Sequence, residues 1–189
     1  MAKVIDKQSA IVNAALKLLV ENGFHNTPMS LIAREAGVSA GIIYHYFENK
    51  EDLINQIYLE IDAQLSQALL GDKLDNLEGL ELLRQAWLDL YAFYVAHPVE
   101  ALFLEQYKNS PFYKLDESES EEKWKPLIQK VVQAIAEGKI TDLPFDVLYN
   151  LTFGVAMSLA KQQIAGATAL DDKTLQKVAD AVCRSVRAG

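Results

Sequence analysis

Residues 27–53 decide the fold, and they read TPMSLIAREAGVSAGIIYHYFENKEDL. Apolar residues recur at helical spacing up to Gly37, which accepts the left-handed backbone conformation in which many helices end. We expect Thr27 to cap this helix, with Pro28 at the first helical position, where a missing N–H costs nothing. Ser39 should cap a second short helix. Two short helices joined by a tight turn predict a helix-turn-helix, a unit whose second helix enters the major groove of DNA.

Two further helices are expected to flank this unit. The segment 5–22 carries apolar residues along one side, and Gly23 should end it. The next helix should be capped by the side chain of Asn49, with Asp52 at the position of a capping-box acid. These patterns predict a three-helix N-terminal domain at residues 1–49.

The second helix of the unit is expected to have a buried and an exposed side. Ile43 and Phe47 are four residues apart and should both face the core. The neighbours that then point outward are Ala40, Gly41, Tyr44 and His45, with Tyr46 at the flank. Gly41 would let the backbone approach a base edge closely, while tyrosine hydroxyls and a histidine N–H suit phosphate oxygens. Lys50 lies in the first turn of the next helix, where free N–H groups and a lysine can hold one phosphate together.

Two observations argue against a DNA-contacting surface. The first is that the aromatic side chains of Tyr44, His45 and Tyr46 could pack against the core instead of facing DNA. Three adjacent residues cannot all face one core at 3.6 residues per turn, however, so this alternative does not account for all of them. Second, the net charge is −8, which taken alone disfavours a nucleic-acid partner. However, residues 1–50 carry five Lys and Arg against four Asp and Glu, so the acidic excess lies after them. Because phosphate affinity depends on local charge, we expect weak nonspecific binding and a need for a dimer.

The text IAREAGVSAGIIYHYFENKEDL at residues 32–53 closely resembles the DNA-binding domain of the Tet repressor family. The resemblance is carried by Ala-Gly-Val-Ser, a Gly two residues later, an aromatic run ending in Phe, and then Asn-Lys-Glu. It places DNA contacts at the outward-facing positions and at Lys50, and it adds two residues at helix N-termini. The full predicted set is Thr27, Ser39, Ala40, Gly41, Tyr44, His45, Tyr46 and Lys50.

The sequence departs from the family pattern at two positions of the second helix. Position 40 is commonly basic in the family but is Ala40 here, and position 42 is often small or polar but is Ile42 here. Both changes remove hydrogen-bonding capacity and favour apolar contact, for example with a thymine methyl group. The operator sequence therefore cannot be transferred from a relative.

The remainder of the chain is expected to be helical, because no segment sustains the alternation that is typical of strands. The expected helices cover residues 50–71, 77–97, 100–109, 124–137, 145–165 and 171–187, with a turn at 71–76 and an acidic connection at 110–122. Asp171 should cap the last helix. With the resemblance, the predicted class is all-α, with an N-terminal three-helix DNA-binding domain and a larger C-terminal ligand-binding and dimerisation domain at residues 50–189.

The second domain is rich in aromatic residues, and the resemblance implies that it binds a small-molecule effector. A pocket for an apolar or aromatic effector would be lined by aromatic rings, with a few polar groups fixing its orientation. The predicted ligand-binding residues are Trp87, Tyr91, Phe103, Gln106, Tyr107, Tyr149 and Phe153. The alternative for each of them is an ordinary place in a helical core.

The last two expected helices carry the features of a dimer interface. Gly154 and Ser158 are four residues apart and would let another helix approach closely. The last helix has an apolar stripe, from which we predict Leu175, Val178, Val182 and Val186 as interface residues. Two such helices from each chain would form a four-helix interface. The alternative is that these residues are buried within one chain.

Catalytic, metal and cofactor sites are not indicated. The histidines at positions 25, 45 and 97 stand in separate segments, and the acidic run at 117–122 lacks the ligand pattern of a calcium loop. There is no glycine-rich phosphate loop and no nucleophile elbow. One cysteine excludes an internal disulfide and fits a reducing compartment. Residues 1–9 have no signal-peptide pattern, and no apolar run approaches the ~20 residues that span a bilayer, so a cytoplasmic protein without membrane contact is expected.

The sequence therefore predicts a homodimeric, ligand-responsive transcriptional regulator rather than an enzyme. It would act as a repressor that binds a palindromic operator in double-stranded DNA and is released by an unknown small-molecule effector. The alternative is a helical small-molecule-binding protein or enzyme whose N-terminal module no longer binds DNA. The low positive charge of residues 1–50 and the departures at Ala40 and Ile42 motivate that alternative.

Overall fold

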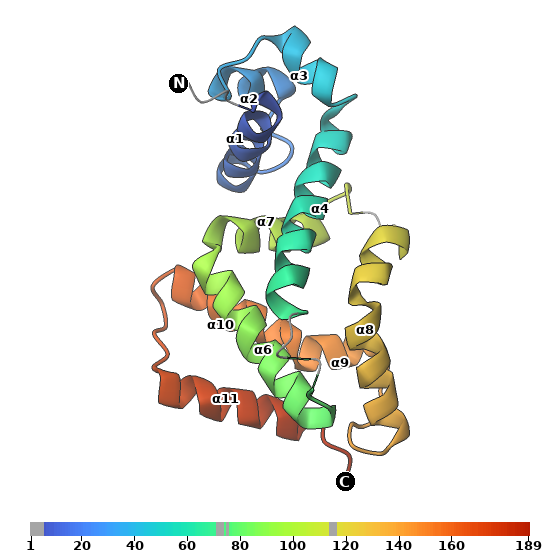
Figure 1. Ribbon diagram of the computed structural model, residues 1–189. Coiled ribbons are helices and arrows are strands. Elements are labelled where there is room, and N and C mark those ends of the chain that lie inside the picture. Colours follow the sequence, from blue (N-terminus) through green and yellow to red (C-terminus); the bar gives the residue numbers. More distant parts are fainter. Residues whose placement is uncertain (1–5, 71–73, 75, 114–116) are drawn as a thin grey trace, which may run out of the picture. The chain divides into compact units, whose positions relative to one another are not determined.

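The computed structural model describes residues 6–70, 74, 76–113 and 117–189, and for residues 117–121 it describes the backbone only. Across these residues the chain is helical and has no strand, apart from one isolated bridge between Ile140 and Arg187, so the all-α prediction is confirmed. Most of the predicted turn at 71–76 lies outside the described residues. The helices in chain order (Figure 1) are α1 (Lys7–Asn22), α2 (Met29–Glu35), α3 (Ala40–Tyr46), α4 (Lys50–Leu69), α6 (Gly79–Ala96), α7 (Pro98–Lys108), α8 (Glu117–Ala136), α9 (Phe145–Leu151), α10 (Phe153–Ile164) and α11 (Asp172–Ser185). Among the described residues, no helix is both long and apolar enough to cross a bilayer.

The chain forms two compact units. The first, which we call the head, combines Met1–Asp62 with Val99–Leu115, and the second, the body, combines Ala63–Pro98 with Asp116–Gly189. The head thus contains α7 and most of α4 in addition to α1, α2 and α3. The predicted functional division between residues 49 and 50 stays a prediction, because compactness alone does not locate a functional boundary.

Local capping explains where the helices of the head begin and end. Asp6 caps α1 by accepting a hydrogen bond from the Gln8 N–H at 3.1 Å, so this helix starts two residues later than expected. Gly37 ends the turn after α2 with φ +66°, the left-handed conformation predicted for it. The side chain of Asn49 accepts from the Asp52 N–H at 2.9 Å, and the Asp52 carboxylate accepts from the Glu48 N–H at 3.0 Å. The predicted cap of α4 is therefore confirmed.

The core of the body is built around α6, which packs against α8, α10 and α11. Trp87 of α6 is fully buried, and its indole N–H donates to the Thr152 carbonyl at 3.1 Å. Thr152 has φ −112° and ψ −85°, and its hydroxyl donates to the Leu148 carbonyl at 2.6 Å. The helix predicted at residues 145–165 is therefore wrong as one element, because the buried Thr152 divides it into α9 and α10.

The acidic connection predicted at residues 110–122 needs a second correction. Its central residues 114–116 lie outside the described part of the chain, but α8 already begins at Glu117 and carries Pro126 inside it. Glutamate is a good helix former and is favoured in the first turn of a helix, so a run of glutamates can begin α8 rather than remain a loop. At the other end of the body, Asp171 caps α11 as predicted, accepting from the Thr174 N–H at 2.7 Å.

Tyr94 of α6 makes the stability of the body vary with pH in the alkaline range. Burial, together with the charge of Tyr149 and a hydrogen bond with it, raises the pKa of Tyr94 well above its ordinary value. In the unfolded chain the Tyr94 phenol ionises near pH ~10. In the folded body the raised pKa keeps this phenol neutral at that pH. Its contribution to stability is therefore complete below that pH and is lost as the pH rises further.

We predict that the urea midpoint of Tyr94→Phe falls less between about pH 9 and 11 than that of the wild type. Unfolding followed by circular dichroism at several pH values measures this difference. Tyr44→Phe is the control, because Tyr44 is 56% exposed, and it should follow the wild-type pH dependence. Equal alkaline slopes for all three proteins would contradict the prediction.

Candidate nucleic-acid interface

The seven-residue helix α3 has the two sides that the sequence predicts. Ile43 is 0% and the following Phe47 is 2% exposed, so these two side chains anchor the helix to the head. The opposite side is open: the exposed residues are Ser39, Ala40, Gly41, Tyr44, His45 and Tyr46. Tyr44 is 56% and Tyr46 38% exposed, so the packing alternative for them is not supported. The ring of Tyr46 contacts that of His45 edge to face, with centroids 5.3 Å apart.

Gly41 is not required by the fold of the head. Its backbone has no positive φ, and a Cβ added there would meet no described atom within 4 Å apart from its neighbours and the backbone of α3 itself. Ser39 precedes α3 as its cap residue, although its side chain makes no capping hydrogen bond. Both residues can therefore contact a molecule outside the chain.

The half-buried side chain of Lys50 reaches back to the residue that follows α1. Its ammonium donates to the backbone carbonyl of Phe24, and partial burial lowers the pKa of Lys50 below its ordinary value. An ammonium has three donors, so one carbonyl leaves two for a phosphate. Lys50 also stands at the start of α4, where the first backbone N–H groups of the helix have no intrahelical acceptor.

Thr27 differs from its predicted role. The residue before α2 is Pro28, so Thr27 does not cap this helix. Its side chain is fully buried, and its hydroxyl donates to the carbonyls of Leu18 at 3.1 Å and Gly23 at 2.9 Å. The hydroxyl thus ties the end of α1 to the loop before α2, and the side chain is not on the exposed surface of α3.

Comparison with known proteins identifies this arrangement. The pattern of the family described as bacterial regulatory proteins, tetR family, matches residues 11–57, and that of the tetracyclin repressor-like C-terminal domain matches residues 81–187. Together the two matches cover most of the chain. The chain belongs to the TetR family. It is therefore a transcriptional regulator with a DNA-binding helix-turn-helix, and the family assignment favours this function over the enzyme alternative.

Individual relatives agree with the family assignment. An uncharacterised HTH-type transcriptional regulator of Haemophilus influenzae is 28% identical over 156 residues, which are 82% of each chain. A TetR-family regulator of Vibrio parahaemolyticus is 26% identical, with a TM-score of 0.82 over 97% of this chain and 100% of that one. A TetR-family regulator of Marinobacter aquaeolei is 23% identical, with a TM-score of 0.88 over 97% and 96% of the chains, and this likeness shows the fold alone.

In this TetR-family regulator the residues predicted to bind an effector are divided between the two units. Phe103 and Tyr107 are buried in the head, where their rings lie 5.8 Å apart, and the Gln106 amide donates to the Val20 carbonyl at 3.1 Å. These three residues therefore pack α7 within the head. The sequence could not reveal this, since α7 follows α6 of the body along the chain.

The other four predicted effector residues lie in the body and are in contact in pairs. The rings of Trp87 and Tyr91 stack with centroids 5.8 Å apart, and those of Tyr149 and Phe153 lie 5.9 Å apart. The Tyr91 hydroxyl donates to the side-chain oxygen of Gln163 at 2.5 Å. These contacts satisfy the polar atoms of Trp87 and Tyr91 within the body, as expected for core residues, and their role in effector binding stays a prediction.

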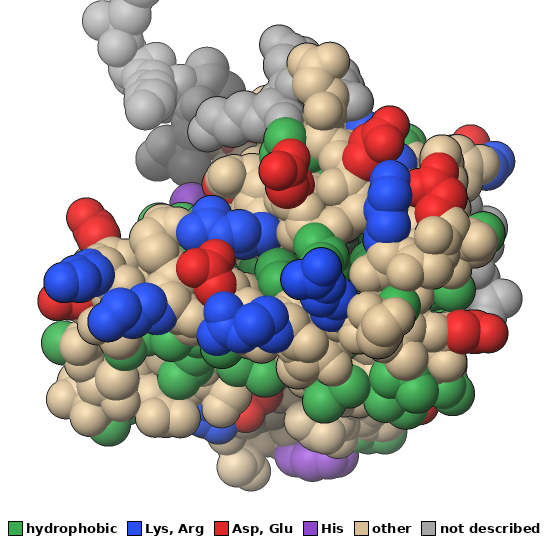
Figure 2. Space-filling model, turned by 90° about the horizontal axis from the view of Figure 1, so that it is seen from below, with side chains coloured by type: hydrophobic (Ala, Val, Ile, Leu, Met, Phe, Trp, Pro, Cys, Tyr) green, Lys and Arg blue, Asp and Glu red, His purple; other side chains and the backbone are tan. Residues whose placement is uncertain are grey.

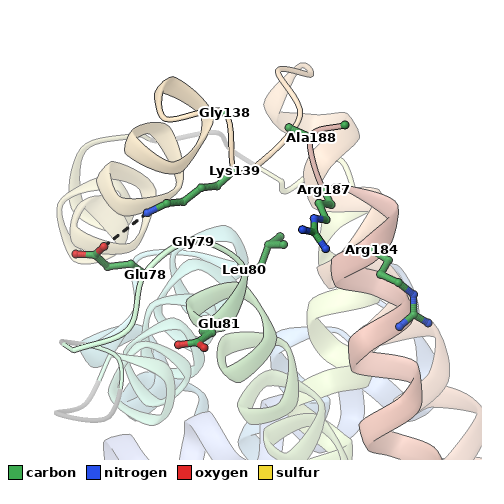
Figure 3. A pocket seen from close by; sticks show the side chains of 10 residues that line it. Glu78, Gly79, Leu80, Glu81, Gly138, Lys139, Arg184, Arg187 and Ala188 are labelled. Carbon is green, nitrogen blue, oxygen red and sulfur yellow. Dashed lines mark ion pairs between the residues drawn. The ribbon is translucent and has the colours of Figure 1, made fainter.

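An open hollow in the body has a different character from an apolar effector site (Figure 3). It is lined by Glu78, Gly79, Leu80, Glu81, Gly138, Lys139, Arg184, Arg187, Ala188 and Gly189. Lys139 pairs with Glu137 at 2.6 Å and with Glu78 at 3.8 Å. Lys and Arg side chains also gather on the face seen in Figure 2. None of the predicted effector residues lines this hollow.

The residues predicted to form the dimer interface differ in how far they are buried. Val182 and Val186 are 6% and 0% exposed, and Val186 packs in the core of the body with Leu83 and Ile140. Packing within one chain already covers most or all of these two side chains, and their place in a dimer interface stays a prediction. Leu175 and Val178 are half-buried, Gly154 is half-buried, and Ser158 is exposed. Val147 and Leu151, which the sequence analysis does not name, lie one turn apart on α9 and are both exposed.

We predict that Thr27→Val destabilises the head by about 1–3 kcal/mol, because a buried polar contact is lost at a fully buried site. Chemical unfolding followed by the fluorescence of a dye that reports exposed apolar surface, or by circular dichroism, measures this cost. Thr27→Ser keeps the hydroxyl and should retain most of the stability. If the valine variant is as stable as the serine variant, the two hydrogen bonds of Thr27 do not support the fold.

Proposed function

We propose that this TetR-family regulator is a homodimeric repressor that binds a palindromic operator with α3 and leaves it when an effector binds. The observation that carries the proposal is that α3 has one buried side and one exposed side. Ile43 of α3 and Phe47, which directly follows the helix, are almost completely buried, while the residues of α3 that were predicted to contact DNA are exposed. A protein that did not use this surface would have no need for two exposed tyrosines beside an exposed glycine.

The proposed contact surface follows from the exposure of each predicted residue. It retains Ser39, Ala40, Gly41, Tyr44, His45, Tyr46 and Lys50, and it omits the buried side chain of Thr27. Gly41 and Ala40 would allow close approach to base edges, because neither has a long side chain. The hydroxyls of Tyr44 and Tyr46 and the ammonium of Lys50 would contact phosphates and fix the position of α3 on the duplex.

A dimer is required because one short helix reads only a few base pairs. Two recognition helices enter successive major grooves on one side of the DNA when they lie about 34–36 Å apart. We place the dimer surface on Val147 and Leu151 of α9 and on Gly154 and Ser158 of α10. The three atoms nearest to a Cβ added at Gly154 all belong to Tyr149 and Asn150 of the adjoining α9, so among the described residues no side chain of another helix comes closer to it.

The effector is proposed to be a small apolar or aromatic molecule bound in the body. One protein of the same architecture, FadR of Bacillus subtilis, was solved in complex with stearoyl-CoA, and it is 20% identical with a TM-score of 0.64. That likeness concerns the fold alone and does not give this chain the same effector. It supports the use of amphipathic molecules among the probes. An effector releases DNA only if it binds the DNA-incompetent spacing of the recognition helices more tightly than the competent one.

DNA binding is tested by fluorescence anisotropy with the duplex that lies upstream of the chain's own coding sequence. We predict that Gly41→Leu keeps full stability but weakens binding by at least about tenfold and changes sequence preference, since a side chain would block close approach to the bases. Lys50→Ala should weaken binding to all sequences alike. It should also reduce the slope of log affinity against log salt concentration by about one. Asn13→Leu is the control, because Asn13 is exposed on α1 of the same unit. Flat titrations of the wild type at low salt would refute the proposal.

The dimer surface is tested by sedimentation. We predict that Leu151→Asp shifts the protein from dimer to monomer, because a carboxylate would have to lose its water in an apolar interface. Val132→Asp is the control: Val132 is an exposed apolar residue on α8, 57% exposed against 39% for Leu151, and it lies outside the proposed surface. A dimer that survives Leu151→Asp but not Val132→Asp would place the interface elsewhere.

A further inference from the structure

The contacts of Phe24 connect α7 with a proposed DNA contact. Phe24 follows α1 and is buried in the head, with 6% of its surface exposed. Its ring contacts the ring of Phe103 on α7 at 5.6 Å and stacks with the ring of Phe112, just beyond α7, at 5.9 Å. Its backbone carbonyl accepts the hydrogen bond from the Lys50 ammonium. One residue thus joins two parts of the head that are far apart in sequence.

Several further contacts hold α7 in the head. The Gln106 amide donates to the Val20 carbonyl in the last turns of α1 at 3.1 Å. The ring of Tyr107 stacks with that of Tyr58 of α4 at 4.8 Å, and its hydroxyl donates to the Asn55 side chain at 3.3 Å. At its other end α7 is joined directly to α6, since the boundary between body and head falls between Pro98 and Val99. The chain therefore passes directly from α6 of the body into the segment that packs on Phe24.

We infer that Phe24 is a positioning residue for DNA binding: the rings of Phe103 and Phe112 hold it, and its carbonyl holds the Lys50 ammonium in place for a phosphate. A free lysine side chain loses much rotational freedom when it is fixed on a phosphate, whereas a lysine that is already held loses less. Loosening Phe24 should therefore lower the affinity for DNA although Phe24 itself contacts no DNA. This inference rests on the proposed function in taking Lys50 as a DNA contact.

The test uses the full-length protein and a matched pair of substitutions. Phe112→Leu removes a ring that stacks with Phe24, and Tyr113→Leu removes the neighbouring ring, which contacts Tyr107 instead with centroids 5.6 Å apart. Affinity for the upstream duplex is measured by anisotropy in each variant, alone and combined with Lys50→Ala. Exchange of the Lys50 ammonium protons with water is measured without DNA by NMR of protein labelled with nitrogen-15 lysine, and the signal is assigned by its loss in Lys50→Ala.

We predict that Phe112→Leu lowers the affinity about three- to tenfold and speeds the exchange of the Lys50 ammonium, because the carbonyl of Phe24 no longer holds it firmly. Tyr113→Leu should change neither quantity. In the Lys50→Ala background, Phe112→Leu should cost no further affinity, since coupled residues are not additive. Gln106→Leu, which frees α7 from the Val20 carbonyl, should act in the same direction and replaces Phe112→Leu if that variant fails to fold.

Two results would overturn the inference. One is wild-type exchange and affinity in both Phe112→Leu and Gln106→Leu. The other is an affinity loss of equal size with and without Lys50, because the effect would then not pass through Lys50. Failure of the wild type to bind any duplex would instead refute the proposed function, and the exchange rates measured without DNA would still decide whether Phe24 positions Lys50.

Discussion

The position of α3 in the head depends on the burial of Ile43 in this helix and of Phe47 directly after it. A helix of seven residues is too short to be stable alone, because the cost of its first turn is not recovered over so few hydrogen bonds. Ile43 and the adjoining Phe47 supply the missing stability by packing against the rest of the head, and each is almost completely buried. The same burial fixes the rotation of the helix about its own axis. It therefore also determines which residues of α3 are presented to solvent.

This dependence explains why the sequence predicts the head well. Two apolar residues four apart, a glycine with φ +66° at the turn and a capping asparagine are all local features, and each acts within a few residues. Thr27 was predicted less well, because its hydroxyl bonds to carbonyls of Leu18 and Gly23, and Leu18 lies nine residues away. A threonine before a proline looks the same in sequence whether its side chain caps a helix or closes a loop.

The body was predicted less completely, and the reasons are contacts between distant residues. Thr152 interrupts a continuous helical pattern at a position where its carbonyl receives the indole N–H of Trp87, 65 residues away. The apolar stripe of α11 has no sequence feature that separates burial in one chain from burial between two, and Val182 and Val186 proved to belong to the core of the body. The place of α7 is a third case. It follows α6 of the body along the chain, yet its Phe103 packs with Phe24 in the head.

The proposed response to an effector requires a connection between the two units. The head is joined to the body through α4 and also through α7, and α7 holds the residue whose carbonyl binds Lys50. A regulator needs such a joint, because an effector in the body can alter DNA affinity only through segments that both units share.

The central claim is that the exposed side of α3 faces DNA, and hydroxyl-radical labelling of tyrosines with and without the upstream duplex tests it most directly. The account predicts that DNA strongly protects Tyr44 and Tyr46, which are 56% and 38% exposed in the free chain, and leaves Tyr113, also 38% exposed, labelled as before. Bound protein in which Tyr44 and Tyr46 are labelled as readily as in the free protein would contradict the claim.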